Sequence, residues 1–422
     1  MRIISLEEAG ARLANLSGEE PRVVVSGNLA TPTALVDALV ASRERCRLFA
    51  INAQAGWPQR SGLINETPFV GPGVRHDPSL EYLPMRLSLV PRLFDTLRPV
   101  DAVLVHTSVP RGGMVSLGIE VDILPAAVER AHARGGLVIA QLNPNMPYTF
   151  GDGEIPVDSI DFAVEADVPL LSAPSRQIGQ ADRSIGERVA RFAHDGATLQ
   201  LGIGKIPDVA ASRLVDRRHL GIWSEMISDG VLALERAGAL DLGRPIQTSF
   251  LSGSSELYEW AHTNPRLQMV RTEVINDPAS IADNPAMVSV NMALQIDLVA
   301  QANASFVAGV VYSGFGGQAD FVTGALHSPG GQAVVAMHSW HEKTDTSSVV
   351  PILPNPVTSF QHSAIISDQG CAEIFGRSQQ DQARLIIERV ADPRAREELL
   401  EAAGSSGLLQ GTGPADRRGS NA

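Results

Sequence analysis

The chain has 422 residues, a formal net charge of −13 and a hydrophobic content of 44%. That hydrophobic fraction excludes a wholly disordered protein, and the length is enough for two or three domains with large buried cores. The acidic balance argues against a broad basic surface, so we expect no nucleic-acid partner.

Short apolar runs alternate with helical patterns along most of the chain. The expected strands are Arg22–Ser26, Arg47–Ile51, Ala102–His106, Leu137–Leu142, Phe162–Val164, Thr198–Gly202, Thr248–Phe250, Met287–Val290, Phe306–Val311 and Ala333–Met337. The expected helices include Pro32–Ala41, Val121–Arg134, Asp182–Ala193 and Asp208–Val215. This order predicts an α/β fold with open, mainly parallel sheets, whose ligands lie beyond the carboxyl ends of the strands.

A change of pattern near residue 175 predicts two domains. The segment Pro169–Ile178 holds two prolines and no clear period, as linkers do. We therefore expect one α/β domain over residues 1–175 and a second over residues 176–403. The remaining residues 404–422 are rich in glycine and serine, and we expect them to be a disordered tail.

A glycine turn follows the expected strand Thr198–Gly202. Gly202 and Gly204 precede Lys205 and Ile206, and Pro207 and Asp208 suit the first turn of a helix. Backbone amides at such a helix start can bind an anion, and glycine lets a ligand approach closely. The third glycine of a dinucleotide fingerprint is missing, so a plain strand-to-helix turn remains the alternative.

A glutamate ends a second apolar strand. Glu225 closes the run that begins at Leu220 and is followed by a turn at Ser228–Gly230. A carboxylate at the carboxyl end of a strand lies at the mouth of a site, where an ionised side chain can act as a nucleophile. A helix-capping or salt-bridged glutamate is the alternative.

A glycine-rich loop follows the third strand of interest, Phe306–Val311. Gly314, Gly316 and Gly317 fall within four positions and form a backbone nest that could hold an oxyanion. A mobile loop is the alternative reading. Gln318, beside this loop, and Ser224, beside Glu225, are further candidates for positioning a substrate carboxylate.

In this order and spacing the segments resemble the acetyl-CoA hydrolase/transferase family of class I CoA-transferases, similar to 4-hydroxybutyrate and acetate CoA-transferases. The resemblance runs from about Ser26 to about Ala403. It is carried by Tyr82–Pro84, Pro91–Phe94, Ser116–Asp122, Gln141–Pro147, Gly196–Pro207, Ser224–Gly230, Asn276–Pro278, Met287–Asn291, Gly314–Phe321 and Gly330–Gly331.

The resemblance implies two α/β domains of the CoA-transferase type with the active site at their interface. It implies that Glu225 is the catalytic nucleophile and forms a glutamyl-CoA thioester. The CoA-binding residues that it implies are Gly202, Ile203, Gly204, Lys205, Ile206, Gly314, Gly316 and Gly317.

The sequence departs from the family pattern at several positions, which include Trp340 and His341, where small residues are usual. Asp368 and Gln369 stand in a segment where the family often has Thr-Glu-Tyr-Gly, and Ser348 replaces a basic residue. We therefore expect an altered acyl pocket or CoA-phosphate contact, and the acids exchanged stay open.

Three functions are compatible with these residues. The first is CoA transfer between an acyl-CoA and a carboxylic acid by a ping-pong mechanism. The second is acyl-CoA hydrolysis at the same site, and the third is a non-catalytic acyl-CoA sensor. We expect no metal and no cofactor beyond the CoA thioester that serves as substrate. The family resemblance implies a homo-oligomer.

The expected location is the cytoplasm. The two cysteines, Cys46 and Cys371, are too few for a disulfide framework or a four-cysteine zinc site. The first ten residues do not resemble a signal peptide, and no apolar run reaches 18 residues, so we expect no membrane partner.

Overall fold

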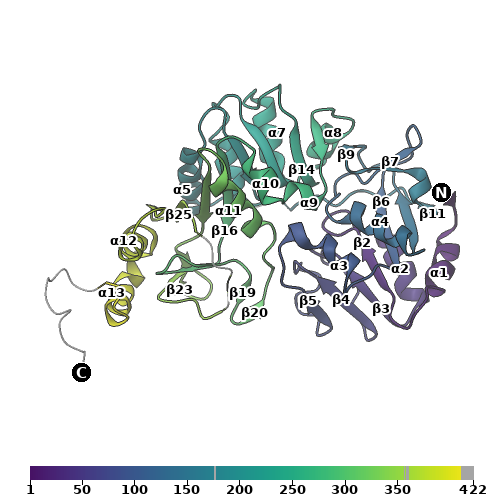
Figure 1. The fold of residues 1–422 in the computed structure, drawn as a ribbon, viewed down its shortest axis with the longest axis horizontal. Helices are drawn as coiled ribbons and strands as arrows, with labels where there is room; N and C mark the ends of the chain where they lie inside the picture. The colour runs from purple at the N-terminus through teal and green to yellow at the C-terminus, as the bar shows by residue number, and fades with distance from the viewer. Residues whose placement is uncertain (175–176, 356, 358–360, 410–422) are drawn as a thin grey trace.

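The computed structural model describes residues 1–174, 177–355, 357 and 361–409. Within them lie two large β-sheets with helices around them (Figure 1). In spatial order the first sheet contains β1 (Arg2–Ile3), β11 (Phe162–Glu165), β8 (Leu137–Leu142), β6 (Ala102–Thr107), β2 (Arg22–Val25), β3 (Cys46–Phe49), β4 (Leu63–Thr67) and β5 (Leu80–Tyr82). All its strand pairs are parallel.

The second sheet is also mainly parallel. In spatial order it contains β26 (Cys371–Glu373), β25 (Ala364–Ile366), β21 (Gln332–Ala336), β16 (Met287–Met292), β12 (Thr198–Leu201), β13 (Gly221–Ile227), β14 (Ile246–Leu251), β15 (Leu267–Met269) and β9 (Phe150–Gly151). The β25–β26 pair is antiparallel and the other pairs are parallel. The predicted α/β class with mainly parallel sheets is therefore confirmed.

Helices cover the faces of both sheets and close the core. They are α1 (Leu6–Ala14), α2 (Thr33–Ser42), α3 (Pro91–Asp95), α4 (Leu124–Ala133), α5 (Gln180–Val189), α6 (Lys205–Ser212), α7 (Asp229–Arg236), α8 (Ser255–Ala261), α9 (Thr272–Ile275), α10 (Pro278–Ala282), α11 (Gln318–His327), α12 (Gln379–Leu385) and α13 (Arg396–Ser405). Strand β2 contains a run of three valines because it is buried on both faces. Val23 and Val25 pack in a cluster with Leu13 and Leu35 of α1 and α2, and Val24 belongs to a core that also includes Leu199 of the second sheet.

In the part of the chain that the structure describes, short strands form four small sheets beside the large ones. They pair β7 (Met114–Ser116) with β10 (Glu154–Pro156), β17 (Gln295–Asp297) with β18 (Ala302–Asn303) and β24 (Val349–Val350), β19 (Phe306–Val307) with β20 (Val310–Val311), and β22 (Trp340–His341) with β23 (Thr346–Ser347). The prediction of one strand over Phe306–Val311 is wrong. Ala308 and Gly309 have φ values of 49° and 79°, as a tight hairpin turn requires, so the run folds back on itself.

The two large sheets draw on overlapping stretches of the chain. The first uses strands from β1 to β11, whereas β9, which precedes β11 in the chain, joins the second sheet. The division at residue 175 stays a prediction, and residues 175 and 176 lie outside the described residues. Helix α13 extends to Ser405, and Leu408 and Leu409 pack on the nearby core, so the expected disordered tail does not begin at residue 404. Residues 410–422 lie outside the described residues.

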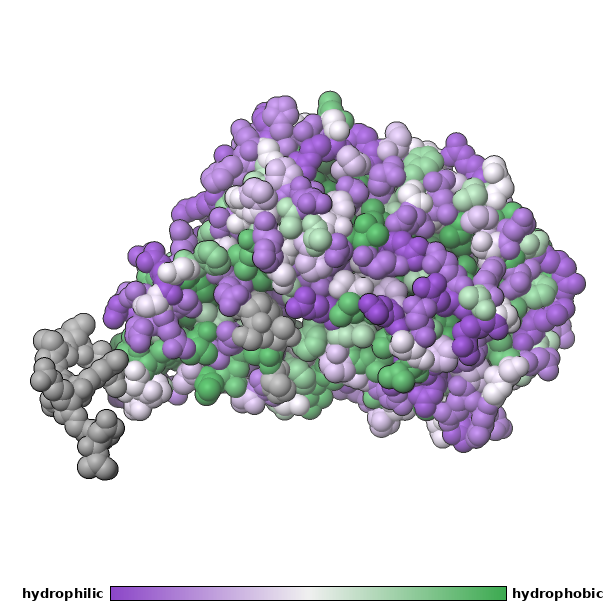
Figure 2. All heavy atoms as spheres, in the orientation of Figure 1, coloured by the Kyte–Doolittle hydropathy of each residue, from purple (hydrophilic) through white to green (hydrophobic). Residues whose placement is uncertain are grey.

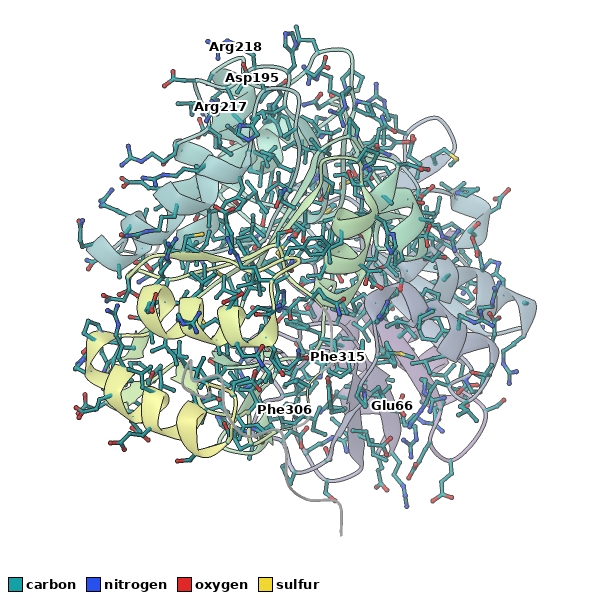
Figure 3. All side chains as sticks on the ribbon, turned by 60° about the vertical axis from the view of Figure 1, so that its left-hand side comes forward. Glu66, Asp195, Arg217, Arg218, Phe306 and Phe315 are labelled. Atoms are coloured by element: carbon teal, nitrogen blue, oxygen red, sulfur yellow. The ribbon has the colours of Figure 1, made fainter. Side chains whose placement is uncertain are left out.

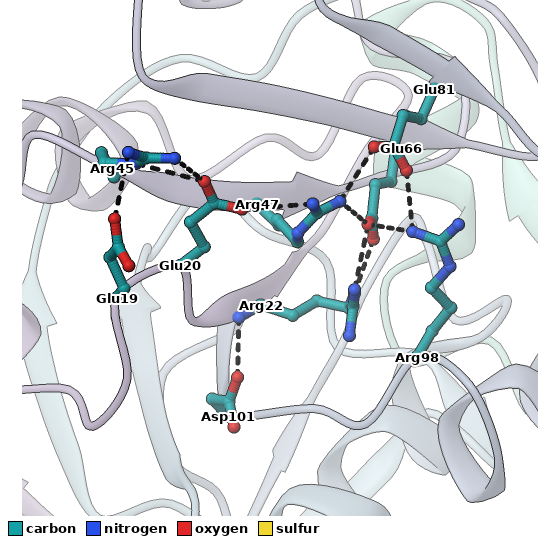
Figure 4. Close-up of polar contacts among 9 residues, drawn as sticks. All are labelled: Glu19, Glu20, Arg22, Arg45, Arg47, Glu66, Glu81, Arg98 and Asp101. Carbon is teal, nitrogen blue, oxygen red and sulfur yellow. Dashed lines mark hydrogen bonds and ion pairs between the residues drawn. The ribbon is translucent and has the colours of Figure 1, made fainter.

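A buried ion-pair network joins three strands of the first sheet (Figure 4). Glu66 on β4 is 1% exposed and accepts hydrogen bonds from Arg22 on β2 at 2.6 and 3.0 Å and from Arg47 on β3 at 2.9 Å. Arg98 also contacts this carboxylate. Burial alone would raise the pKa of Glu66, but the hydrogen bonds and charges of the arginines hold it below its ordinary value.

The surface is largely polar on the face that Figure 2 shows, with apolar residues gathered over the region of β19, β20 and β23. Val307 of β19 and Val310 of β20 are among the exposed large apolar side chains there. No helix in the described part of the chain has the length and apolar character needed to cross a membrane. The cytoplasmic location and the homo-oligomer stay predictions.

Candidate active site

Glu225 owes its position to the alternation of side chains along β13. Trp223 and Glu225 share one face of the strand. Trp223 Nε1 donates to the carbonyl oxygen of Ile275 at 2.8 Å, which fixes the end of α9 against that face. The next residue, Asn276, then meets the carboxylate, and its Nδ2 donates to Glu225 Oε2 at 2.7 Å. Thr272 Oγ1 lies 3.3 Å from Asn276 Oδ1 and so orients the amide.

The predicted glycine turn joins β12 to α6. Strand β12 ends at Leu201 and the helix begins at Lys205, so the turn consists of residues 202–204. Gly204 has φ 128° and ψ −178°, a conformation that is essentially restricted to glycine. Lys205 Nζ lies 3.6 Å from Asp182 Oδ2, and this contact holds the lysine beside the turn.

The second glycine loop contacts the segment that follows β4 of the first sheet. Val70 N–H donates to the carbonyl oxygen of Ser313 at 2.7 Å. A Cβ atom on Gly314 would lie 2.5 Å from the carbonyl oxygen of Pro68 and 3.1 Å from Phe69 Cα, so this approach requires glycine. Phe315 of the same loop is drawn near the centre of the view in Figure 3. The loop therefore bridges the segment after β4 and the start of α11.

Gly317 lies directly against the candidate nucleophile. A Cβ atom at this position would lie 2.0 Å from Glu225 Oε2 and 2.5 Å from Asn276 Nδ2. The carboxylate thus occupies the space that any other residue would fill. Gly317 has φ −85° and ψ −2°, an ordinary backbone conformation, so the need for glycine here is one of space alone.

A cavity of about 820 Å³ brings these parts together. Its wall contains residues that follow strands of the first sheet, such as Asn28, Asn52 and Phe69, and residues of the second sheet's loops. The predicted site residues in this wall are Gly202, Ile203, Gly204, Lys205, Glu225, Gly314, Gly316 and Gly317. Ile206 is the exception: its side chain is 2% exposed and packs in the hydrophobic core, because the first turn of α6 faces inward there. The roles assigned to these residues stay predictions.

The electrostatics of the site favour a basic carboxylate. Burial raises the pKa of Glu225 to about 7, although the Asn276 hydrogen bond lowers it, and the charge of Asp320 adds to the rise. Asp320 on α11 is fully buried and accepts from Ser88 Oγ at 2.9 Å, and burial raises its pKa to about 6. Arg86 lies 3.8 Å from Asp320. Near neutral pH a substantial fraction of the molecules therefore has Glu225 ionised. Because its pKa is raised, this carboxylate is more basic than that of an ordinary glutamate.

This pKa leads to a prediction about pH. A nucleophilic Glu225 must be deprotonated, so kcat/KM should rise with pH and level off above an apparent pKa near 7. Replacing Asn276 by alanine removes the hydrogen bond that favours the charged form, and the rising limb should move to higher pH. A pH profile of Asn276→Ala beside Asn284→Ala checks this, because Asn284 lies just after α10 and its side-chain Nδ2 donates to the backbone oxygens of Ser280 and Ile281. An unmoved limb in Asn276→Ala would contradict the assignment.

Several residues of the site did not stand out in the sequence. Asn276 belongs to a segment noted above, yet nothing in its spacing indicated contact with Glu225. Of the two further candidates, Ser224 is buried and its hydroxyl lies within hydrogen-bond distance of the backbone oxygens of residues 201 and 226. Gln318 lines the cavity, and its buried Nε2 has no hydrogen-bond partner among the described residues.

Three of the departures from the family pattern lie elsewhere. Ser348 is 5% exposed, and Asp368 accepts hydrogen bonds from the backbone and hydroxyl of Ser339 at 2.7 and 2.9 Å. Gln369 lines a second cavity of about 690 Å³. Among the described residues, the wall of the Glu225 cavity includes none of the three, so the expected change of acyl pocket does not come from direct contact there.

Comparison with known proteins identifies the family. Residues 64–171 match the acetyl-CoA hydrolase/transferase N-terminal domain, and residues 253–403 match the C-terminal domain. Glu225 and the Gly202–Lys205 turn lie between the two matched stretches. Both matched stretches contribute to the cavity, through Phe69 and Arg75 in the first and the Gly314–Gly317 loop in the second.

Individual relatives cover nearly the whole chain. The chain is 35% identical to 4-hydroxybutyrate coenzyme A transferase of Clostridium kluyveri, over 94% of this chain and 96% of that protein. It is 32% identical to succinyl-CoA:acetate/propanoyl-CoA:succinate CoA transferase of Fasciola hepatica, over 90% of this chain and 84% of that protein. The crystal structure of RipA from Yersinia pestis superposes with a TM-score of 0.89 at 28% identity, over 97% of this chain and 98% of that one. The two matched domains and the 35% identity to a relative over nearly the whole chain show that this chain belongs to the acetyl-CoA hydrolase/transferase family.

Proposed function

We propose that this protein is a CoA-transferase that moves CoA from an acyl-CoA to a carboxylic acid through a glutamyl-CoA thioester on Glu225. The observation that carries the proposal is the position of this carboxylate. It lies in a cavity lined by both glycine segments, hydrogen-bonded to Asn276, with its pKa raised to about 7. The relatives at 35% and 32% identity, both of which are named as CoA transferases, support it.

The reaction consists of two half-reactions that share the thioester on Glu225. The Glu225 carboxylate attacks the acyl-CoA carbonyl, the C–S bond breaks, and a mixed anhydride and CoA thiolate form. The thiolate then attacks the glutamyl carbonyl, which releases the donor acid and leaves CoA as a thioester on Glu225. The acceptor acid runs the same steps in reverse, so product leaves before the second substrate reacts.

Each step passes through a tetrahedral oxyanion that needs hydrogen-bond donors. Asn276 Nδ2 donates to the Glu225 carboxylate at 2.7 Å, and the same N–H can donate to the oxyanion that forms during the reaction. The backbone amides of the Gly202–Lys205 turn lie at the start of α6, where the helix dipole favours negative charge. The loop at Gly314–Gly317 brings further backbone amides to the same cavity.

Isotope exchange tests this ping-pong mechanism. With acetyl-CoA and labelled acetate as the only reactants, label should enter acetyl-CoA, because the glutamyl-CoA enzyme reacts with either acetate molecule. The same exchange is measured for propionate, butyrate and succinate with their own thioesters, and Glu225→Gln should abolish it. Release of free CoA at a rate that no added acid changes would instead show hydrolysis. Tight acyl-CoA binding with neither exchange nor hydrolysis would show a sensor and contradict the proposal.

A further inference from the structure

The second cavity, of about 690 Å³, lies at the edge of the second sheet opposite to the Glu225 site. Its wall includes Ala197 and Ala286, which directly precede β12 and β16, and Gln332, the first residue of β21. These are the amino ends of parallel strands, whereas Glu225 lies toward the carboxyl end of β13 in the same sheet. Among the described residues, none lines both cavities, so the two are separate.

Three arginines from separate segments line the second cavity. Arg188 lies in the last turn of α5, Arg191 follows this helix, and Arg389 lies in the π-helical segment Ile386–Val390. Arg188 donates to the backbone oxygen of Ser184 at 3.0 Å. Within the described part of the chain, none of the three guanidiniums forms an ion pair with a carboxylate.

The thiol of Cys371 shows that these three guanidiniums converge. Cys371 is the first residue of β26 and lines the same cavity. Burial and the charge of Glu373 raise the pKa of this thiol to about 11, and the charges of the three arginines act in the opposite direction. All three arginines therefore lie within electrostatic reach of one sulfur atom, although they come from distant parts of the chain.

The carboxylates of the cavity wall do not neutralise the arginines. Glu373 and Glu388 line the cavity, but neither forms an ion pair with an arginine among the residues that the structure describes. His194 lies in the same wall and adds positive charge whenever it is protonated. Guanidiniums that are held together without counter-ions repel one another, and an anion between them would relieve this repulsion.

A neighbouring loop adds further positive charge beside the cavity (Figure 3). Arg218 N–H donates to Asp195 Oδ1 at 3.0 Å, and Gly196 N–H donates to the carbonyl oxygen of Arg218 at 2.9 Å. These bonds hold Arg217 and Arg218 next to the segment that contains His194 of the cavity wall. Grouped positive charges of this kind attract anions, even on a protein whose net charge is −13.

The chemistry of the wall indicates what kind of anion fits. A guanidinium offers parallel N–H donors that match the paired oxygens of a phosphate or a carboxylate. Three guanidiniums can bind more than one such group, so they favour a ligand with at least two negative charges. The volume is typical of small-molecule sites, and the side-chain amides of Gln332 and Gln369 can bind the neutral part of a ligand.

We propose that the second cavity is a binding site for a small molecule that carries two or more phosphate or carboxylate groups, held by Arg188, Arg191 and Arg389. The site is separate from the Glu225 cavity, so the ligand and an acyl-CoA can be bound at the same time. The inference does not rest on the proposed function of Glu225.

Calorimetric titration with inorganic pyrophosphate and with citrate tests this site. The full chain is titrated near physiological ionic strength with CoA present in excess, which keeps the probes out of any site that CoA occupies. At least one probe should bind in a 1:1 ratio with a Kd below about 1 mM. Arg191→Gln and Arg389→Gln each remove an exposed charged donor and should weaken binding about tenfold or more.

Arg183→Gln is the matched control, because Arg183 is an exposed arginine of α5 outside the cavity wall and should not affect binding. Binding of pyrophosphate alone would assign phosphate groups to the ligand, and binding of citrate alone would assign carboxylates; either result supports the site. No heat of binding from either probe, or affinities that both cavity variants leave unchanged, would overturn it. Equal weakening in Arg183→Gln would also overturn it, because general surface charge would then explain the binding.

Discussion

Replacing Glu225 by glutamine is expected to lower kcat for CoA transfer at least about 10⁴-fold, because the amide is no nucleophile and no glutamyl-CoA can form. Glu225→Asp keeps the charge but withdraws the carboxylate by one methylene, and a displacement of about 1 Å should cost roughly a hundredfold. Steady-state rates with a saturating acyl-CoA and acid measure both effects. Glu259→Gln, on the exposed side of α8, is the matched control and should keep full activity.

The inactive glutamine variant should nevertheless be the more stable protein at alkaline pH. The folded state raises the pKa of Glu225 to about 7 from its ordinary value of 4.5, so its contribution to stability is full below pH 4.5 and is lost as pH rises through 7. At pH 8 Glu225→Gln removes a buried charge and should gain on the order of 1–3 kcal/mol in unfolding free energy. Thermal unfolding at pH 8 and pH 5 checks this, because the gain should shrink at pH 5. A variant that is inactive and also less stable at pH 8 would point to misfolding instead of a lost nucleophile.

Gly317→Ala is expected to lower kcat on the order of a hundredfold with only a small loss of stability. The added Cβ would lie 2.0 Å from Glu225 Oε2 and 2.5 Å from Asn276 Nδ2, so the carboxylate and its amide partner must both move. Misplacement of a reacting group by about 1 Å is enough for such a loss. The backbone tolerates alanine at φ −85°, so unfolding should change by no more than about 1 kcal/mol from the poorer helix cap.

The control for Gly317 is a glycine with free space around it. A Cβ on Gly404 in α13 meets no atom within 4 Å among those described, and Gly404→Ala should retain wild-type kcat. Activity of Gly317→Ala within threefold of the wild type would show that the carboxylate does not occupy the position assigned to it.

Periodicity predicted central strands that are buried on both faces, such as β2, β6 and β12, but it did not predict the more exposed edge strands β1 and β5. The apolar run at β2 and the glycine turn after β12 could be predicted because each depends only on residues that are neighbours in the sequence. Glu225 could be predicted for the same reason, since a carboxylate that closes an apolar strand lies at the mouth of a parallel sheet. The hairpin at Ala308–Gly309 was missed because a run of apolar residues looks the same whether it is straight or folded.

Contacts between distant segments could not be read from the sequence. Asn276 meets Glu225 only because Trp223 fixes the end of α9, a relation across about fifty positions. Ile206 lies in the core because the start of α6 faces inward, which spacing alone did not reveal. Asn28 and Asn52 did carry a signal, an asparagine directly beyond the carboxyl end of an apolar strand, but their common cavity depends on how the two sheets pack.

Glu66 and Glu225 show how surroundings decide the behaviour of one residue type. Both lie against the core of a sheet, but three arginines surround Glu66 and lower its pKa, which suits a structural role. Glu225 has an amide partner and the acidic neighbour Asp320, and burial raises its pKa to about 7. The contrast separates a charge that joins strands from a carboxylate that is free to react.

The most direct test of the central claim is peptide mass spectrometry after incubation with an acyl-CoA in the absence of an acceptor acid. Acetyl-, propionyl-, butyryl- and succinyl-CoA are tried in turn, with Glu225→Gln as the matched control. We expect a CoA adduct on the peptide that contains Glu225, absent from the variant and discharged by an added carboxylic acid. An adduct on another residue, or full exchange activity in Glu225→Gln, would contradict the account.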